Sequence, residues 1–447
     1  MAEPSKGDDW MKAYEVIVIG GGPAGLAAAL AAHRAGGRVL IIEREERLGG
    51  ILKQCIHDGF GLVRFGEKLS GPEYAERFID EVLEMGIDFL TSSFVTELKK
   101  DGEGFCVSVV NRDGVTDYQA GALVLATGCR ERTARQVLIH GTRPAGIFTA
   151  GTAQHFTNLL GQLPTKRCVI LGSGDIGLIM ARRLTLEGAV VLGVYEAKPS
   201  PSGLTRNLVQ CLEDFDIPLY LSHTVTRVFG EERLTAVEVA QVDGQMKPVP
   251  GTSRIIECDG LILSVGLIPE NEAAGQLGVP MDEASKGPVC DNRFMTQVPG
   301  VFSCGNALHV NDLVDYVSES GELAGKNAAA YAAGKAGMAV GTSENAGKAD
   351  DSDSGVCLDF SADDSFLYLV PHKLRWQDRD KKAVLYFRSR EVLKNAVFTM
   401  SVDGEVVYTR KYSRLKPPEM ERLEIDFGKY PIQRGGQLRF EIKEGMG

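Results

Sequence analysis

The alternation of apolar and polar stretches in residues 14–43 predicts a strand, a turn, a helix and a second strand. An apolar run rich in β-branched residues, 16–19, predicts a buried strand, and an alanine-rich stretch that ends near Ala35 predicts the helix. A second apolar run, 39–42, predicts the next strand, which ends at Glu43. The rest of the chain is organised around this unit.

The turn between the first strand and the helix has the glycine spacing of a dinucleotide-binding loop. Gly20 permits a tight turn, Gly22 lets the backbone approach a pyrophosphate, and Gly25 lets helix and strand pack closely. The helix N-terminus directs N–H groups and a partial positive charge at the phosphates. Glu43 is spaced to accept the ribose hydroxyls.

A second unit of the same kind begins about 150 residues later. The apolar run 168–171 predicts a strand, a helix reaches to about Glu187, and the strand 190–195 ends at Glu196. The glycines of its turn are Gly172, Gly174 and Gly177. Two such units amount to a repeat of fold and predict two bound dinucleotides.

Glu196 bears on the choice of nicotinamide coenzyme. A carboxylate at the end of the second strand binds a ribose diol and repels a 2′-phosphate, which favours NAD over NADP. Lys198 and Arg206 lie nearby in the sequence and would favour NADP.

The C-terminal pattern changes from mixed helix and strand to strands alone. Residues 70–85 and 312–333 read as helices, and 94–118 and 122–128 as strands, with a turn at Asp113–Gly114 in the first range. After a Gly/Ala/Ser/Asp-rich linker, about 90 residues alternate in period two. A hairpin turn at Asp403–Gly404 supports a small antiparallel β-sandwich, interpreted as a docking or oligomerisation module.

Composition excludes several functional classes. The net charge of −11 and a pI near 5.3 argue against nucleic acid or an anionic membrane as a partner. No apolar run reaches the roughly 18 residues of a transmembrane helix, and the polar N-terminus is unlike a signal peptide. The nine cysteines are scattered and include no C-x-x-C pair, which favours a reducing cytoplasm over a disulfide framework or a metal site.

Few side chains outside the fingerprints suggest chemistry. Cys55 and His57 follow a Gly49–Gly50 loop, either as a thiol and an imidazole that serve catalysis or as ordinary loop residues. The same two alternatives apply to His309, whereas Cys304 is predicted to be a buried core residue. The arginine cluster within 130–135 is either a phosphate contact or a solvated turn.

Both fingerprints, the Ala-Thr-Gly at 126–128 and the segment PGVFSCGN at 299–306 occur in the order of a known family. The chain resembles the two-dinucleotide flavoproteins that include thioredoxin reductase. The resemblance covers roughly residues 14–335 and implies an α/β fold with two Rossmann-like domains, FAD in the first and NAD in the second, to which the alternation adds the C-terminal β-sandwich. The implied order is a tail (1–13), a first FAD-binding segment (14–150), an inserted NAD-binding domain (155–280), a second FAD-binding segment (285–335), a linker (336–355) and the sandwich (356–447).

A narrower resemblance concerns the assembly. GGILKQCIHDGFG, RPAGIFTAGTAQ and CGNALHVNDLVDYVSESGE are similar to bacterial flavin subunits associated with glycerol-3-phosphate-type or 2-hydroxyacid dehydrogenases. The flavin subunits of opine oxidase and hydrogen cyanide synthase are more distant. The resemblance implies a partner flavoprotein dehydrogenase and a small cysteine-rich protein, and it leaves a homo-oligomer open.

Two departures from the family pattern affect the expected chemistry. The disulfide reductases carry a C-x-x-C or C-x-x-x-x-C pair, and neither spacing occurs here. The usual Gly-Asp after the last FAD strand is Gly305–Asn306, so this contact to the ribityl or phosphate region carries no charge. Disulfide reduction is therefore disfavoured, while FAD binding is retained.

The expected site residues follow from these motifs. Cys55 and His57 are the candidate catalytic residues, with no metal ligand. The expected FAD contacts are Gly20, Gly22, Pro23, Ala24, Gly25, Glu43, Arg44, Gly49, Gly50, Ala126, Thr127, Gly128, Gly305, Asn306, Asp315, Tyr316 and Val317. The expected NAD contacts are Gly172, Gly174, Asp175, Ile176, Gly177, Glu196 and Gly266.

The function expected from this set is a flavin-dependent oxidoreductase that passes hydride between NAD(H) and FAD, with the second half-reaction at a partner subunit or a small molecule. Two alternatives stay open. One is a free-standing dehydrogenase of an amine, a hydroxyacid or an opine that acts at its own flavin. The other is a structural subunit that holds nucleotides within a flavoprotein complex.

Overall fold

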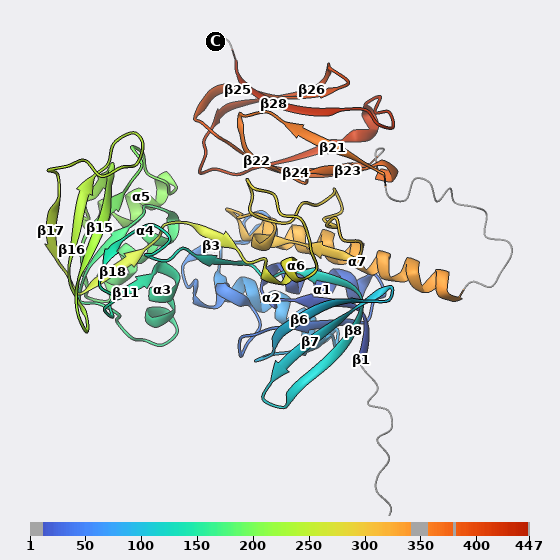
Figure 1. Cartoon of the computed structure of the whole chain (residues 1–447), viewed down its shortest axis with the longest axis horizontal. Coiled ribbons are helices and arrows are strands. Elements are labelled where there is room, and N and C mark those ends of the chain that lie inside the picture. Colours follow the sequence, from blue (N-terminus) through green and yellow to red (C-terminus); the bar gives the residue numbers. More distant parts are fainter. Residues whose placement is uncertain (1–11, 341–355, 379–380, 446–447) are drawn as a thin grey trace, which may run out of the picture. The chain divides into compact units, whose positions relative to one another are not determined.

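The computed structural model describes residues 12–340, 356–378 and 381–445 and contains two compact units (Figure 1). Unit 1 is built from residues 1–52, 57–128 and 269–447, as far as they are described, and unit 2 from residues 53–56 and 129–268. Unit 1 is thus assembled from distant segments of the chain, with unit 2 inserted.

The first fingerprint lies at the centre of a seven-stranded sheet in unit 1. The sheet runs in the order β5-β2-β1-β8-β7-β6, with β20 paired to the end of β8. Strand β1 pairs in parallel with β2 and β8, so its apolar residues are buried on both faces. The strands are β1 (Lys12–Ile19), β2 (Val39–Ile42), β5 (Asp88–Leu90), β6 (Phe94–Asp101), β7 (Gly104–Asn111), β8 (Gly114–Leu125) and β20 (Val301–Ser303).

Strand β8 joins two stretches that the sequence pattern separated. Its first half pairs antiparallel with β7 across the turn at Asp113–Gly114, and residues 123–125 pair in parallel with β20. The alternation up to Tyr118 and the apolar run from Ala122 are therefore one strand. The change from half-buried to fully buried surroundings explains the change of pattern.

Helices α1 (Pro23–Arg34) and α7 (Val314–Val340) pack side by side although they are far apart in the sequence (Figure 1). Their backbones approach closely because α7 has Gly321 and Gly325 at the contact. A Cβ atom would lie 2.1 Å from the Ala24 carbonyl oxygen at the first position and 2.0 Å from that of Ala28 at the second. Helix α7 extends beyond the expected helix, and residues 341–355 of the expected linker lie outside the described residues, as do residues 1–11 of the expected tail.

Helix α2 (Gly71–Glu84) matches the expected helix at 70–85. Its start is set by a capping box in which Ser70 and Glu73 exchange side-chain and backbone hydrogen bonds. Pro72 occupies the first turn, where its missing N–H is tolerated.

Unit 2 contains a five-stranded parallel sheet around the second fingerprint, in the order β11-β18-β12-β13-β14. The elements are β11 (Ile147–Thr149), α3 (Ala150–Asn158), β12 (Arg167–Leu171), α4 (Asp175–Leu186), β13 (Val190–Glu196), α5 (Thr205–Cys211), β14 (Leu219–Leu221) and β18 (Gly260–Leu263). A second sheet, β10-β15-β16-β17, is formed by β10 (His140–Gly141), β15 (His223–Gly230), β16 (Leu234–Gln241) and β17 (Arg254–Glu257).

Three segments lie in a different unit from the one that the sequence suggested. Residues 269–280 were expected in the NAD-binding domain but belong to unit 1, and residues 53–56 were expected in the FAD-binding domain but belong to unit 2. Residues 129–150 were also expected in the FAD-binding domain, but they belong to unit 2. The reason is strand pairing: Ile147 to Thr149 align with Leu261 to Leu263 of β18.

The C-terminal region is a β-sandwich, as expected, with sheets β23-β21-β28-β25-β26 and β22-β24-β27. Both sheets are antiparallel except for the parallel pair β21–β28. Asp403 and Gly404 form the β25–β26 turn, and both have positive φ angles, of 51° and 90°. The strands are β21 (Cys357–Ala362), β22 (Phe366–Val370), β23 (Lys373–Arg375), β24 (Lys382–Ser389), β25 (Leu393–Val402), β26 (Glu405–Leu415), β27 (Glu421–Asp426) and β28 (Leu438–Glu444).

The sandwich belongs to unit 1 and shares its core. Phe387, Phe398 and Phe440 fill the space between the two sheets. Tyr368 and Tyr386, from the sheet β22-β24-β27, instead join the core of α1 and α7. This sheet is thus covered by the chain's own dinucleotide-binding fold.

The fold confirms an α/β protein with two Rossmann-like domains and a C-terminal β-sandwich. The remaining short elements are β3 (Asp58–Phe60), β4 (Leu69–Ser70), β9 (Cys129–Glu131), β19 (Leu267–Pro269), α6 (Glu272–Gln276) and the 3₁₀ turns η1 (Gly50–Gln54), η2 (Glu213–Phe215), η3 (Gly305–Ala307), η5 (Trp376–Asp378) and η6 (Phe427–Lys429). Within the described ranges, no helix combines the length and apolar character needed to span a bilayer.

The α1–α7 contact gives a matched pair of substitutions on one helix. Gly321→Ala forces a Cβ into the Ala24 carbonyl and is expected to lower the free energy of unfolding by about 1–3 kcal/mol. A Cβ at Gly334 has no atom within 4 Å. Gly334→Ala is therefore expected to raise the free energy of unfolding by up to about 1 kcal/mol, because alanine has the higher helix propensity. Urea unfolding of both variants measures the difference. Equal effects would contradict the close backbone contact.

Candidate dinucleotide sites

The glycine turn of unit 1 is a steric requirement of the fold at two of its three positions. Gly20 has a φ of +107°, and a Cβ there would lie 2.3 Å from the carbonyl oxygen of Ala126. A Cβ at Gly25 would lie 1.8 Å from the carbonyl oxygen of Gly20. The turn and the packing of α1 on β1 therefore depend on these glycines.

Gly22 differs from its neighbours because the protein itself does not require a glycine there. Its φ of −77° suits any residue, and the nearest atom to an added Cβ is the Gly50 Cα at 3.8 Å. Gly22 is the N-cap of α1, with Pro23 in the first turn and free N–H groups behind it. Glycine at an uncrowded position is explained by a ligand whose phosphates approach the backbone, so this cradle fits a dinucleotide pyrophosphate.

Glu43 closes the same loop from the end of β2. Its side chain is buried, and its Oε2 accepts a hydrogen bond from the Gly21 N–H at 2.7 Å. Its Oε1 accepts one from the Glu45 N–H at 2.8 Å. The carboxylate therefore fixes the glycine loop and retains lone pairs for a ribose diol.

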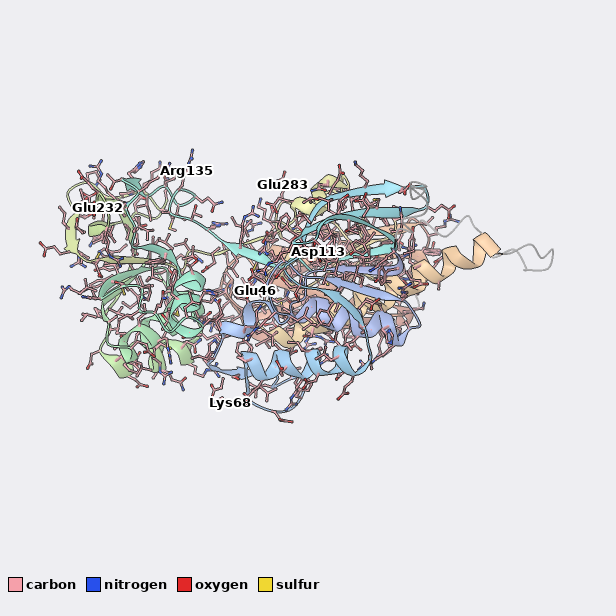
Figure 2. All side chains as sticks on the ribbon, turned by 90° about the horizontal axis from the view of Figure 1, so that it is seen from below. Glu46, Lys68, Asp113, Arg135, Glu232 and Glu283 are labelled. Carbon is pink, nitrogen blue, oxygen red and sulfur yellow. The ribbon has the colours of Figure 1, made fainter. Side chains whose placement is uncertain are left out.

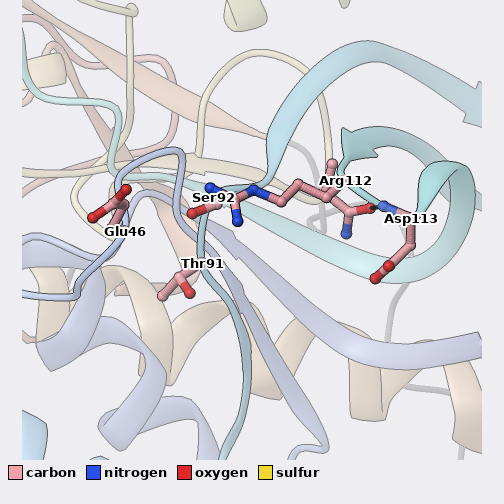
Figure 3. A pocket seen from close by; sticks show the side chains of 6 residues that line it. Glu46, Thr91, Ser92, Arg112 and Asp113 are labelled. Carbon is pink, nitrogen blue, oxygen red and sulfur yellow. Dashed lines mark hydrogen bonds between the residues drawn. The ribbon is translucent and has the colours of Figure 1, made fainter.

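A surface hollow of about 400 Å³ lies beside Glu43. It is lined by Glu46, Thr91, Ser92, Asn111, Arg112 and Asp113, and Arg112 extends from the β7–β8 turn toward Ser92 (Figure 3). The Ser93 N–H bonds to the Glu43 carbonyl oxygen at 3.0 Å, so the hollow adjoins the carboxyl ends of β2 and β5. Ligands of open α/β sheets bind at this end of the strands.

The loop after β2 and the Ala-Thr-Gly segment both meet the glycine turn. A Cβ at Gly50 would lie 2.9 Å from the Gly22 Cα, and the Gly49 N–H donates to the Gly21 carbonyl at 2.8 Å. The Thr127 hydroxyl donates to the Glu270 carbonyl at 2.6 Å. Glu270 also pairs with Arg44 at 2.9 Å, an ion pair that no sequence motif indicated.

Gly305 and the start of α7 border the first turn of α1. A Cβ at Gly305 would lie 2.7 Å from the Ala24 Cβ and 3.3 Å from the Val317 side chain. The Gly305 N–H donates to the Ser320 hydroxyl at 2.8 Å. The predicted contacts at the beginning of α7 and after β20 therefore lie at the same end of the fold as Gly20 and Gly22.

The polar residues of this segment have defined partners. The Asn306 Oδ1 accepts from the Asn311 N–H at 3.0 Å. Asp315 is buried and accepts from the Arg64 N–H at 2.9 Å. Tyr316 contacts the sandwich, where its ring lies 6.1 Å from that of Tyr386. No sequence motif indicated the contact of Arg64, because this residue lies in an irregular loop.

Unit 2 repeats the glycine geometry. Gly172 has a φ of +97°, and a Cβ there would lie 2.0 Å from the Ser264 carbonyl oxygen. A Cβ at Gly177 would meet the Ser264 Cβ at 2.7 Å, whereas one at Gly174 meets its nearest atom, the Ser264 Oγ, only at 3.4 Å. The middle glycine is again the one left for a ligand. Ser264 is a packing residue that the motifs did not predict, although it ends an apolar strand.

Glu196 corresponds to Glu43. It is buried, its Oε2 accepts from the Ser173 N–H at 3.0 Å and from the Ser173 hydroxyl at 2.6 Å, and its Oε1 accepts from the Lys198 N–H at 3.0 Å. Lys198 thus contributes its backbone to the same loop. In both units, a buried glutamate accepts a hydrogen bond from a backbone N–H of the glycine turn.

The other predicted residues of unit 2 have structural partners. The Asp175 Oδ1 accepts from the Asn207 amide at 2.6 Å, which ties α4 to α5. Ile176 packs against the core of the same unit. The Gly266 carbonyl accepts from the Arg132 N–H at 3.1 Å, and Gly266 has a φ of +102°.

Cys55 and His57 have different surroundings. Burial raises the pKa of the Cys55 thiol to about 12, so it stays protonated near neutral pH and is a weak nucleophile. Its sulfur lies 3.8 Å from the Gln154 Oε1. The half-buried His57 contacts the Asp58 carbonyl at 3.2 Å and the ring of Phe60 at 5.0 Å. Their catalytic role stays a hypothesis.

All nine cysteines lie in the described ranges, and no disulfide bond joins any of them there. The same ranges hold no group of three or more His, Cys, Asp or Glu side chains arranged for a metal ion. From the arginine cluster, Arg135 is exposed on the surface of unit 2 (Figure 2). This exposure supports the interpretation that Arg135 belongs to a solvated surface turn.

Comparison with known proteins agrees with this geometry. The profile of the pyridine nucleotide-disulphide oxidoreductase family matches residues 14–337, so the chain belongs to this family. It is an FAD-dependent, NAD(P)-linked oxidoreductase. This confirms the resemblance that the motifs suggested.

Similar proteins include reductases, a subunit of an oxidase and a subunit of a synthase. Thioredoxin reductase of Listeria innocua is 26% identical over 72% of this chain and 94% of its own length. An opine oxidase subunit of Agrobacterium tumefaciens is 24% identical over 74% of this chain and 67% of its own. Hydrogen cyanide synthase subunit HcnB of Pseudomonas protegens is 28% identical over 61% and 60%. The solved thioredoxin reductase of T. acidophilum shares the fold, with a TM-score of 0.56 at 24% identity over 73% of this chain and 99% of that chain.

The two uncrowded glycines allow each cradle to be tested separately. Gly22→Ala should fold normally but raise the dissociation constant of FAD at least about tenfold, or ~1.4 kcal/mol, because its methyl group occupies the pyrophosphate approach. Gly174→Ala should leave FAD affinity unchanged and weaken nicotinamide coenzyme binding instead. Flavin fluorescence and coenzyme titrations measure both affinities. Retention of FAD affinity in Gly22→Ala would contradict the assignment.

Proposed function

We propose that the protein passes hydride between NAD(H) and FAD, with the second half-reaction at a partner dehydrogenase subunit or a small molecule. The observation that carries this proposal is the pair of cradles in one chain, each with an uncrowded glycine at a helix N-terminus. When bound, FAD supplies the redox chemistry, because its isoalloxazine exchanges a hydride with a nicotinamide ring. The chain itself would bind FAD and the nicotinamide coenzyme, orient their reactive rings and polarise them.

The residues of unit 1 suit the diphosphate and the ribose of FAD. The N–H groups at the start of α1 would donate to the phosphates, and Glu43, which already accepts from the Gly21 N–H, would accept from the adenosine ribose. The N-terminus of α7 would stabilise negative charge on the pyrimidine end of the flavin. Asn306, held by Asn311, offers an uncharged amide to the ribityl or phosphate region.

The residues of unit 2 suit NAD. Gly174 leaves room for the pyrophosphate, and the buried carboxylate of Glu196 would bind a ribose diol and repel a 2′-phosphate. Lys198 and Arg206 could offset this repulsion at the protein surface, where charges are screened. The preference proposed is therefore NAD.

Dithiol chemistry is not included in the proposal. The sequence has no closely spaced cysteine pair, and burial raises the pKa of Cys55, Cys168 and Cys304 to about 12. Protonated thiols attack disulfides poorly. Electrons are therefore proposed to leave the flavin without a sulfur relay.

An assembly with other subunits is proposed by analogy. The opine oxidase subunit of Agrobacterium tumefaciens, the glutamate synthase small chain of Mycobacterium tuberculosis and hydrogen cyanide synthase subunit HcnB are, by their names, components of larger enzymes. The partners proposed here are a flavoprotein dehydrogenase and a small cysteine-rich protein.

The hydride step predicts a defined spectroscopic result. The purified protein should be yellow, and NADH should bleach its flavin band in the absence of oxygen, with NADH preferred to NADPH by at least about tenfold in kcat/KM, or ~1.4 kcal/mol. Gly174→Ala should bleach more slowly with NADH but normally with dithionite. Stopped-flow absorbance measures both rates.

Three outcomes would redirect the assignment. A protein that cannot be loaded with FAD would contradict it altogether. Bleaching by an amine, a hydroxyacid or an opine without any other protein would favour a free-standing dehydrogenase. Bound FAD that no donor reduces would favour a nucleotide-holding structural subunit.

The partner proposal predicts a second flavin in the native complex. Affinity purification of the tagged chain from its own cells should recover a flavoprotein dehydrogenase together with a cysteine-rich protein, and the complex should reduce the flavin of this chain with a substrate of that dehydrogenase. Mass spectrometry and anaerobic absorbance check both points. A chain that elutes alone and is fully active with a small-molecule acceptor would contradict the proposal.

A further inference from the structure

The sheet β22-β24-β27 of the sandwich is attached to the segment between β20 and the second turn of α7. This segment, residues 305–320, contains the predicted flavin contacts Asn306 and Asp315 and touches α1 through Gly305. The sandwich is therefore next to one wall of the dinucleotide cradle of its own unit.

Arg388, on strand β24, makes the most extensive of these attachments. Its side chain is 11% exposed. Its Nη2 donates to Asp312 and to the Val310 carbonyl at 3.3 Å, and its Nε donates to the Tyr368 hydroxyl at 3.1 Å. The planar guanidinium joins β22 and β24 to the segment that leads into α7, and a lysine could not reproduce this fork of donors.

A second attachment lies further along the helix. Glu319 of α7 accepts from Arg422 of β27, with the Nε donating at 2.8 Å, and from the Tyr386 hydroxyl at 2.8 Å. The Met420 N–H donates to the Asp312 Oδ2 at 2.6 Å. The first turns of α7 and the residues just before them are thereby held by the sandwich.

The seam between these attachments is buried and aromatic. His309 is fully buried, and its ring lies 5.5 Å from that of Tyr368 and 5.0 Å from that of Tyr386. Burial, together with the positive charge of Arg388, lowers the pKa of His309 to about 3, so the imidazole is neutral. Arg388, with an 11% exposed side chain, lies against this seam, so water weakens its hydrogen bonds less than those of an exposed arginine.

We propose that the C-terminal sandwich is a positioning element of the FAD site, and that Arg388 is its principal positioning residue. The argument is geometric: Arg388 fixes Val310 and Asp312, which lie between Asn306 and Asp315 in the sequence. Gly305 and α7 pack on the first turns of α1, so a shift of this segment changes the cradle. Cofactor sites lose affinity and reactivity when supporting groups move by about 1 Å.

This inference rests on the proposed binding of FAD and deepens it. It gives the sandwich a role within its own chain, in place of the docking or oligomerisation role that its sequence suggested. It also explains why β24 carries Tyr386 and Arg388 on the face turned away from the sandwich core. These two residues alternate with the core residues Leu385 and Phe387.

The test compares Arg388→Gln, Arg388→Lys, Arg422→Gln and, as a matched control, Arg439→Gln. Arg439 lies on β28 in the opposite sheet and pairs with Glu441 at 2.9 Å, with a 59% exposed side chain. In the full chain, Arg388→Gln should raise the dissociation rate of FAD at least about tenfold, a ~1.4 kcal/mol effect, and shift the flavin midpoint potential. Arg388→Lys should recover a fraction of the loss, Arg422→Gln should act in the same direction, and Arg439→Gln should match the parent protein.

The readouts separate positioning from stability. If the Arg388 and Arg422 variants unfold at lower urea but keep the parent FAD dissociation rate and potential at low urea, the sandwich is only structural and the inference is overturned. If Arg388→Gln does not fold, the FAD dissociation rate and flavin potential of Arg422→Gln at low urea decide the question alone. If the parent chain binds no FAD, the proposed function fails first and the inference fails with it.

Discussion

The structure depends on backbone contacts that only glycine permits. At the turn between β1 and α1, and again between β12 and α4, carbonyl oxygens occupy the space where a side chain would begin. These contacts bring a helix N-terminus to the end of a parallel sheet. The middle glycine of each turn, Gly22 or Gly174, remains uncrowded and gives a phosphate group room to approach. A steric constraint of the fold thereby shapes the proposed binding site.

The same kind of contact organises unit 1 beyond its first fingerprint. Gly321 and Gly325 let α7 lie against α1, and Gly305 brings the preceding loop to the first turn of α1. Residues from distant regions of the sequence therefore form one cradle. Because α7 also receives hydrogen bonds from the sandwich at Glu319, the C-terminal region of the chain is connected to its first helix.

The same arrangement, a buried glutamate bonded to the glycine loop, occurs in both units. Glu43 and Glu196 each end a central strand and accept hydrogen bonds from the glycine loop of their own unit. Each carboxylate stabilises the loop and retains lone pairs for a ribose. The nine cysteines, by contrast, are scattered along the chain, and burial raises the pKa of the Cys55 thiol.

The sequence by itself determined the two Rossmann units, the glycine turns with their closing glutamates, and the β-sandwich, because hydrophobic periodicity and glycine spacing are local properties. It could not determine that 129–150 joins unit 2 or that β8 is continuous, since both depend on distant strand pairing. Arg388 had no signal for the same reason: its partners Val310 and Asp312 lie more than 70 residues away. Only the tertiary structure decided these contacts, because side chains far apart in sequence become neighbours only when the core assembles.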